Sequence, residues 1–245
     1  MKKLVGFLTP KILDNAFTID LAAALFDAGM DALELGVPFS DPVADGAIIE
    51  AAGHRALANG FTFEDILSIT SGLRGRDLLW MGYTNPFYHR GMERVAKEAA
   101  ALGVKGLIIP DLPHEEAEDY AAQFAAHDLA LIEFVAPTTP ADRIPKLLKN
   151  ARYFIYLVAY AGVTGAKQTE DLSVTLAAIK RASSTPVFVG FGVNRATARA
   201  RAKGADGVIV GSAFVKILLD DHLNNAAKIA AITAEARTIK EIINE

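Results

Sequence analysis

Two acidic residues, Glu34 and Asp45, flank a segment of the chain that is rich in proline and glycine. Glu34 belongs to an apolar run, residues 30–35, which has the length of a buried parallel strand. A carboxylate at the end of such a strand is costly to desolvate unless a partner pairs with it, so a perturbed pKa and a role in proton transfer are expected. Asp45 follows where the chain can fold back over Glu34. Two structural alternatives fit the same residues: Glu34 as a cap for loop amides, and Asp45 as the N-cap of a helix beginning at Gly46.

Glycines mark a second kind of site later in the chain. Residues 190–194 read Gly-Phe-Gly-Val-Asn, and Gly211 is followed by Ser212. Glycine allows backbone N–H groups to approach an anion closely, and Ser212 is expected to open a short helix whose amino end favours negative charge. These residues therefore predict a phosphate site, with tight turns between strands and helices as the alternative.

Short apolar runs alternate with amphipathic helical patterns along the whole chain. Eight strands are expected at 3–8, 31–36, 77–82, 105–109, 129–135, 153–158, 186–190 and 207–210. Helices are expected at 16–28, 46–59, 62–74, 88–101, 114–126, 140–150, 170–182, 194–203, 212–218 and 219–244. Repeated strand–helix units imply parallel strands, and eight of them close an α/β barrel of the (β/α)8 or TIM type, here as a single domain over residues 1–245. A doubly wound open sheet is the rival, but the first strand–helix turn, residues 9–15, lacks the glycines of that fold.

Composition narrows the class of protein. The 245 residues are 51% apolar and carry a net charge of −4, which argues against a basic surface for nucleic acid or anionic membranes. The absence of cysteine excludes disulfides and thiol catalysis. The five histidines show no metal-ligand spacing, so no metal is expected. The apolar start is too short for a signal peptide, and no run spans a membrane, so we expect a cytoplasmic protein.

Several motifs, in order, resemble the alpha chain of tryptophan synthase. They are residues 34–46, 110–113, 136–140, 162–165, 190–192 and 207–212. The resemblance runs from about residue 4 to the final helix. It implies a lyase that cleaves indole-3-glycerol phosphate to indole and glyceraldehyde 3-phosphate in tryptophan biosynthesis. It also implies a tryptophan synthase beta chain as partner in an alpha2-beta2 complex, with pyridoxal phosphate held by that beta chain and no cofactor in this one. The loops after strands 2, 3 (residues 83–87) and 6 would meet the partner.

The resemblance assigns roles to individual residues. Glu34 would be the acid–base group, Asp45 the carboxylate that stabilises the protonated ring, and Thr164 the residue that hydrogen-bonds Asp45 when the strand-6 loop closes. The indole pocket would comprise Phe7, Met81, Ile108, Val135, Tyr156 and Phe191. The phosphate would be bound by Gly165, Gly192, Gly211 and Ser212.

Some residues depart from the family pattern. The sequence starts almost at the first strand, so we expect a barrel without the family's extra amino-terminal helix. Ala47 stands where proline is common, and Tyr160 replaces a polar or basic residue. Glu133 has the parity of Val135, which predicts that it points into the barrel as a rival proton carrier or a paired structural acid. Two other functions stay open: a barrel that mainly activates a beta-type partner, and a free-standing lyase that releases indole.

Overall fold

A computed structural model describes residues 1–159 and 171–245 of the chain. Its strands form one parallel sheet with the order β5-β4-β3-β2-β1-β9-β8-β7-β6. The strands are β1 (Lys3–Leu8), β2 (Ala32–Gly36), β3 (Leu78–Met81), β4 (Gly106–Ile108), β5 (Ala130–Leu131), β6 (Glu133–Val135), β7 (Ile155–Val158), β8 (Val187–Gly190) and β9 (Gly207–Val210). Each expected strand is present; β1 and β9 have the expected bounds, and the others are shorter.

The fifth expected strand, residues 129–135, is split in two and thereby closes the ring. β5 pairs with β4, whereas β6 pairs with β7. Between them, the amide of Ile132 still donates to the carbonyl of Leu107 at 2.9 Å. One extended segment therefore pairs with one neighbour through its first half and with the other neighbour through its second half. This stagger is what a closed barrel of tilted strands requires, so the predicted eight-stranded TIM barrel is confirmed.

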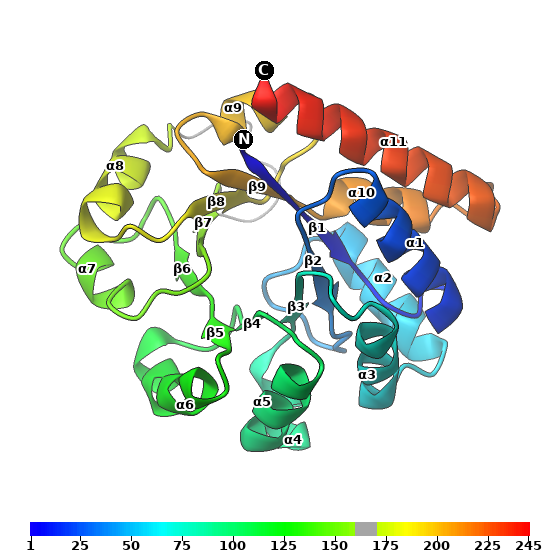
Figure 1. Cartoon of the computed structure of the whole chain (residues 1–245), viewed down its shortest axis with the longest axis horizontal. Coiled ribbons are helices and arrows are strands. Elements are labelled where there is room, and N and C mark those ends of the chain that lie inside the picture. The colour runs from blue at the N-terminus through cyan, green and yellow to red at the C-terminus, as the bar shows by residue number, and fades with distance from the viewer. Residues whose placement is uncertain (160–170) are drawn as a thin grey trace.

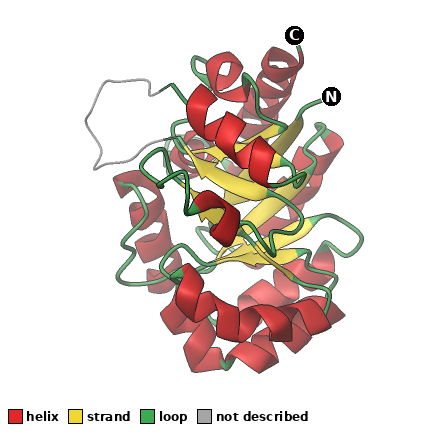
Figure 2. Ribbon diagram, turned by 90° about the vertical axis from the view of Figure 1, so that its left-hand side faces the viewer, coloured by secondary structure: helices red, strands yellow, loops and turns green. Residues whose placement is uncertain are grey.

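Helices surround the strands on all sides of the ring (Figure 1). They are α1 (Asn15–Asp27), α2 (Ala47–Ala58), α3 (Phe63–Gly72), α4 (Thr84–Arg90), α5 (Met92–Ala101), α6 (His114–Ala126), α7 (Ile144–Leu147), α8 (Ser173–Ala182), α9 (Ala198–Ala202), α10 (Ser212–Leu218) and α11 (Asn225–Asn244). Figure 2 shows the strands as an inner layer enclosed by these helices. None of the helices described in residues 1–159 and 171–245 is long and apolar enough to cross a membrane.

Local chemistry explains where the helices differ from expectation. The expected helix 88–101 is two helices, because Gly91 adopts φ 92° between α4 and α5. The expected helix 140–150 shrinks to α7, since Pro145 lacks an N–H group and fits only in the first turn. The last helix begins at Asn225 rather than at 219, because the side chain of Asn224 accepts a hydrogen bond from the amide of Ala227 and caps it.

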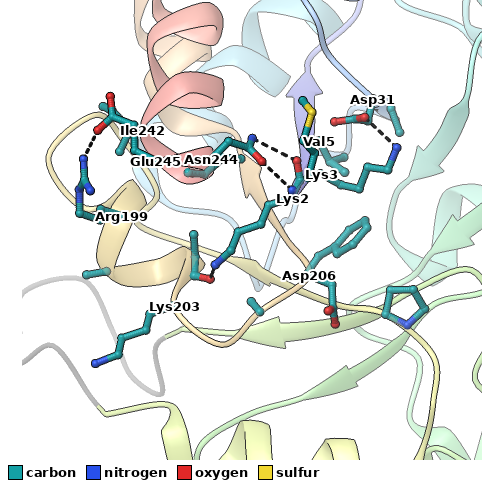
Figure 3. A pocket seen from close by; sticks show the side chains of 18 of the residues that line it. Lys2, Lys3, Val5, Asp31, Arg199, Lys203, Asp206, Ile242, Asn244 and Glu245 are labelled. Atoms are coloured by element: carbon teal, nitrogen blue, oxygen red, sulfur yellow. Dashed lines mark hydrogen bonds and ion pairs between the residues drawn. The ribbon is translucent and has the colours of Figure 1, made fainter.

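The two chain termini contact each other at the end of the barrel where the strands begin. The amide of Lys2 donates to Asn244 Oδ1 at 2.7 Å, and Arg199 pairs with Glu245 (Figure 3). Lys3 pairs with Asp31 at 3.0 Å at the entrance to β2. These contacts border an open cavity of about 1310 Å³ that lies against the amino ends of the strands. The last turn of α11 is thereby held beside the start of the chain, at the end of the barrel opposite to the carboxyl ends of the strands.

Candidate active site

A second cavity, of about 470 Å³, lies at the carboxyl ends of the strands. This is where function gathers in barrels of this kind, because the loops that follow the strands converge there. Most of the residues expected from the sequence line it: Phe7, Glu34, Asp45, Met81, Tyr156, Phe191, Gly192, Gly211 and Ser212. The fold therefore brings together an acid pair, an apolar wall and a glycine-rich end.

Glu34 is the most deeply buried of the acids. It lies on β2 beside Phe7 of β1, and only 1% of its surface is exposed. Its Oε1 atom has no hydrogen-bond partner within the protein. Burial raises the pKa of Glu34 from 4.5 to about 8, because the charged form loses its hydration. At neutral pH the side chain is therefore a protonated carboxyl group that can donate a proton into the cavity.

Asp45 lies in the loop between β2 and α2, where it lines the same cavity. Burial raises its pKa from 3.8 to about 6, a hydrogen bond from Tyr83 opposes that rise, and the negative charge of Glu50 adds to it. Asp45 is therefore ionised at neutral pH while Glu34 is not. Two carboxyl groups in one cavity with separated pKa values are the usual basis of an acid and a base with different roles.

Tyr83, which follows β3, is a site residue that the sequence interpretation missed. It was expected only as part of a loop that meets the partner. Its buried hydroxyl accepts a hydrogen bond from the amide of Ala44 at 3.0 Å, and its capacity to donate a hydrogen bond lowers the pKa of Asp45. Tyr83 also packs against Phe39, with ring centroids 5.5 Å apart. The usable signal in the sequence was a tyrosine just past a strand end, at the edge where Asp45 was expected.

We expect Tyr83→Phe to lower kcat/KM for the chain's reaction by about 10–100-fold, since a hydrogen bond to a charged group is worth about 1.5–3 kcal/mol. Without this donor the pKa of Asp45 rises, so the acid limb of the pH–rate profile moves to higher pH. Steady-state kinetics across pH 5–9 measure both effects. Tyr88→Phe, at a tyrosine that is 66% exposed, is the matched control in the isolated chain. An unchanged pH profile in Tyr83→Phe would contradict this role.

Two glycines make room for the aromatic wall. A Cβ atom on Gly36 would lie 2.4 Å from the ring of Phe7, and one on Gly190 would lie 2.3 Å from the hydroxyl of Tyr156. Tyr156 also packs edge-on against Phe191, with ring centroids 6.0 Å apart. The rings of Phe7 and Tyr156 thus lie across glycines of the neighbouring strands β2 and β8 and line the cavity together with Glu34.

The structure corrects the expected pocket residue on β6. Val135 was expected in the pocket, but it packs in a separate apolar cluster with Ile144 and Leu157, outside the barrel. Phe134 faces inward instead and stacks on Tyr156, with centroids 4.9 Å apart. The register explains this, because Phe134 pairs with Tyr156. Since side chains alternate along a strand, an error of one residue exchanges the inner and outer faces.

The same correction applies to Glu133. Having the parity of Val135, it points outward, so the prediction that it points into the barrel is wrong. Its carboxylate lies 3.4 Å from Nδ1 of the buried His114 on α6. Burial raises the pKa of Glu133, and His114 opposes that rise. Glu133 is a paired structural acid and does not reach the cavity of Glu34.

Ile108 faces the interior of the barrel but lies outside the cavity in which it was expected. It pairs in register with Met81 on β3, so it shares the inward parity, and it is fully buried in the main core. It does not line the cavity. Ile108 therefore supports Met81 from the adjacent strand rather than forming the wall itself.

The far end of the cavity is made of backbone. Phe191 and Gly192 both have left-handed φ angles, 70° and 68°, which glycine adopts freely and phenylalanine does not. Gly211 and Ser212 border the same space. Thr164 and Gly165 lie outside the described residues. The described part of this end offers amide groups and one hydroxyl to an anion.

The first turn of α2 adds residues that were not expected in the site. The remaining lining is Ala44, Gly46, Ala47, Ile48, Ile49, Val193 and Ile209. Ala47, noted as a departure from the family pattern, begins α2, and it lines the cavity with the two isoleucines that follow it. Two adjacent isoleucines, three and four residues after Asp45, were the available signal. Among the described residues, no group of three His, Cys, Asp or Glu side chains could hold a metal ion.

Known proteins resemble this chain along its whole length. A family model described as tryptophan synthase alpha chain matches residues 1–244. The tryptophan synthase alpha chain of Wolinella succinogenes is 51% identical over 100% of this chain and 96% of the relative. That of Chloroflexus aggregans is 42% identical over 98% of this chain and 91% of the relative.

Solved structures give the same picture. A chain of Mycobacterium tuberculosis tryptophan synthase superposes with a TM-score of 0.88 at 33% identity, covering 100% of this chain and 93% of that one. The tryptophan synthase alpha chain of Legionella pneumophila superposes with a TM-score of 0.88 at 31% identity, covering 99% and 92%.

Proposed function

The chain belongs to the tryptophan synthase alpha-chain family, and from that premise we propose that Glu34 and Asp45 form its catalytic pair. The protein is a lyase that cleaves indole-3-glycerol phosphate in tryptophan biosynthesis. The observation that carries the proposal is the presence, in one cavity, of a carboxyl group that is neutral at pH 7 and a carboxylate that is not.

The two acids divide the retro-aldol chemistry between them. Glu34 donates its proton to carbon 3 of the indole ring, which leaves a positive charge on the ring. Asp45, ionised, accepts a hydrogen bond from the ring N–H group and stabilises that charge. Glu34, now a carboxylate, removes the proton of the side-chain hydroxyl next to the ring. The carbon–carbon bond then breaks, its electrons restore the aromatic ring, and indole and the aldehyde leave.

The rest of the cavity orients the substrate. The indole ring lies between Phe7, Met81, Tyr156 and Phe191, with Phe134 supporting Tyr156 from behind. The phosphate is bound by the backbone amides at Gly192 and Gly211 and by Ser212, with Gly165 as a further expected contact. A role of Thr164 in loop closure stays a prediction. Because the apolar wall excludes water, it also sustains the raised pKa of Glu34.

The partner of this chain is the tryptophan synthase beta chain. We propose an alpha2-beta2 assembly in which the loop before α2 and the segment at α4 face that partner across the mouth of the barrel. Val43 and Tyr88, exposed by 80% and 66%, are the large apolar side chains that these segments present. We expect pyridoxal phosphate only in the beta chain. A cytoplasmic location stays a prediction.

The direct test is indole production from indole-3-glycerol phosphate by the purified chain, alone and after addition of a tryptophan synthase beta chain. We expect measurable cleavage by the chain alone and a marked increase in kcat with the partner, because closure of the loops completes the site. High activity that does not respond to the partner would indicate the free-standing lyase. Activation of the beta chain without any cleavage would indicate a barrel that acts only as an allosteric partner.

A further inference from the structure

A buried hydroxyl group near Asp45 has no partner within the protein. Thr9 directly follows β1, and 4% of its surface is exposed. Its Oγ1 atom has no hydrogen bond to any protein group. A buried hydroxyl without a partner costs about 1–3 kcal/mol, so native proteins usually satisfy such a group with a side chain, backbone or water. The hydroxyl of Thr9 therefore calls for an additional hydrogen-bond partner.

A small cavity beside Thr9 supplies the space for one. Its volume is about 20 Å³, and its lining includes Thr9, Asp45, Glu50 and Tyr83. About 10–15 Å³ is enough to hold one water molecule, provided that two to four polar groups surround it. A larger ligand does not fit. The size and the polar lining thus match a single water.

Asp45 lines both this small cavity and the substrate cavity, as Phe7, Ile49 and Met81 also do. Thr9 lines the small cavity and not the substrate cavity; the other space beside it, of about 10 Å³, has Thr18 as its one further polar side chain among the residues that line it. A group in the small cavity can therefore contact Asp45 without occupying the substrate cavity. There it can orient the carboxylate without touching indole-3-glycerol phosphate.

We propose that Thr9 is a positioning residue for Asp45 and acts through one water molecule, which its hydroxyl and the carboxylate hold between them in the small cavity. The inference rests on the proposed catalytic role of Asp45. Thr9 and Tyr83 then fix the carboxylate from two strands, β1 and β3, at the end of a loop that has no regular structure of its own. The water also donates a hydrogen bond to the charged form of Asp45, which favours that form.

Other charged or titratable groups act on Asp45 from neighbouring elements. Hydrogen bonding by Tyr83, after β3, lowers the pKa of Asp45, and the negative charge of Glu50 on α2 raises it. Burial and the negative charges of Glu34 and Asp45 raise the pKa of the Tyr156 hydroxyl on β7. None of these is altered by a substitution at Thr9, so a change in the pH profile of a Thr9 variant reports on the water.

The test compares Thr9→Val with Thr9→Ser in the full chain complexed with the beta chain. Valine keeps the volume of threonine and removes the hydroxyl. We expect Thr9→Val to lower kcat about tenfold with KM unchanged, and to move the acid limb of the profile to higher pH. Thr9→Ser should restore both values. Thr233→Val, which removes a buried hydroxyl on α11 outside the barrel, is the matched control.

Crystal structures provide the second readout. Wild type is expected to show a water within hydrogen-bond distance of Thr9 Oγ1 and Asp45, and Thr9→Val is expected to lack it. A dry cavity in wild type, or wild-type kinetics and pH profile in Thr9→Val, overturns the inference. If Asp45→Asn is inactive while Thr9→Val is normal, only the inference fails. If Asp45→Asn is fully active, the proposed function of Asp45 fails, and the inference fails with it.

Discussion

Replacing Glu34 with glutamine is expected to lower the rate of indole-3-glycerol phosphate cleavage by about 10²–10⁴-fold, the usual contribution of a positioned acid–base group. Glutamine keeps the shape of the side chain and its place on β2, but it has no proton to give to carbon 3 of the ring. Single-turnover measurement of indole formation tests this. Glu133→Gln is the matched control, because Glu133 is also a largely buried acid with a raised pKa but lies outside the cavity.

Glu34→Gln is expected to lower the rate of the reaction but to raise the stability of the fold at high pH. The pKa of Glu34 is about 8 in the folded chain against 4.5 for the unperturbed group, so the folded state binds this proton more tightly. The contribution of this proton to the free energy of unfolding is fully present below about pH 4.5 and is lost as the pH rises towards 8. At about 1.4 kcal/mol per pKa unit the upper bound is about 5 kcal/mol. We therefore expect Glu34→Gln to be more stable than wild type at pH 8.

Urea unfolding of the two proteins at pH 5 and pH 8 measures this difference. Wild type should lose stability between the two values, whereas Glu34→Gln should lose much less. If the variant is inactive but loses stability with pH as wild type does, Glu34 is not the buried neutral acid described above. If Glu34→Gln keeps near-normal turnover, the proposed mechanism is ruled out.

Asp45→Asn is expected to lower kcat by roughly 10²–10³-fold, the range seen when one electrostatic partner of a transition state is removed. Asparagine keeps the size of the side chain and loses the charge that stabilises the protonated ring. Asp41→Asn, in the same loop but on an exposed side chain, is the control and should stay near wild type in the isolated chain. Circular dichroism confirms that both variants are folded.

The pH profile of kcat/KM should be bell-shaped, with limbs near 6 and 8. The acid limb arises because Asp45 must be charged, so activity falls as the pH drops through its pKa of about 6. The basic limb arises because Glu34 must begin protonated, so activity falls above about 8. In the residual activity of Asp45→Asn the acid limb should disappear while the basic limb stays. Retention of both limbs would contradict the assignment of Asp45.

The sequence was sufficient to predict the order of the strands and helices and to single out the two acidic residues, Glu34 and Asp45. Alternating apolar strands and amphipathic helices predicted the barrel, since local periodicity reflects which face of each element is buried. The position of Glu34 in an apolar run predicted a costly carboxylate, and the structure gives its pKa a large upward shift. The helix ends were less predictable, as at Gly91 and Pro145, where one residue changes the local backbone geometry.

Only the tertiary structure determined which residues from distant segments of the chain contact one another. Whether Val135 or Phe134 faces the pocket depends on the register between β6 and β7, which no local pattern fixes when both residues are apolar. Tyr83, Thr9 and Asp45 line one small cavity because three strand ends converge at one edge of a closed ring. Residue type and spacing thus determined which groups could carry the chemistry. The closure of the barrel determined which of them face one another, because parallel pairing places residues far apart in the chain at the same height.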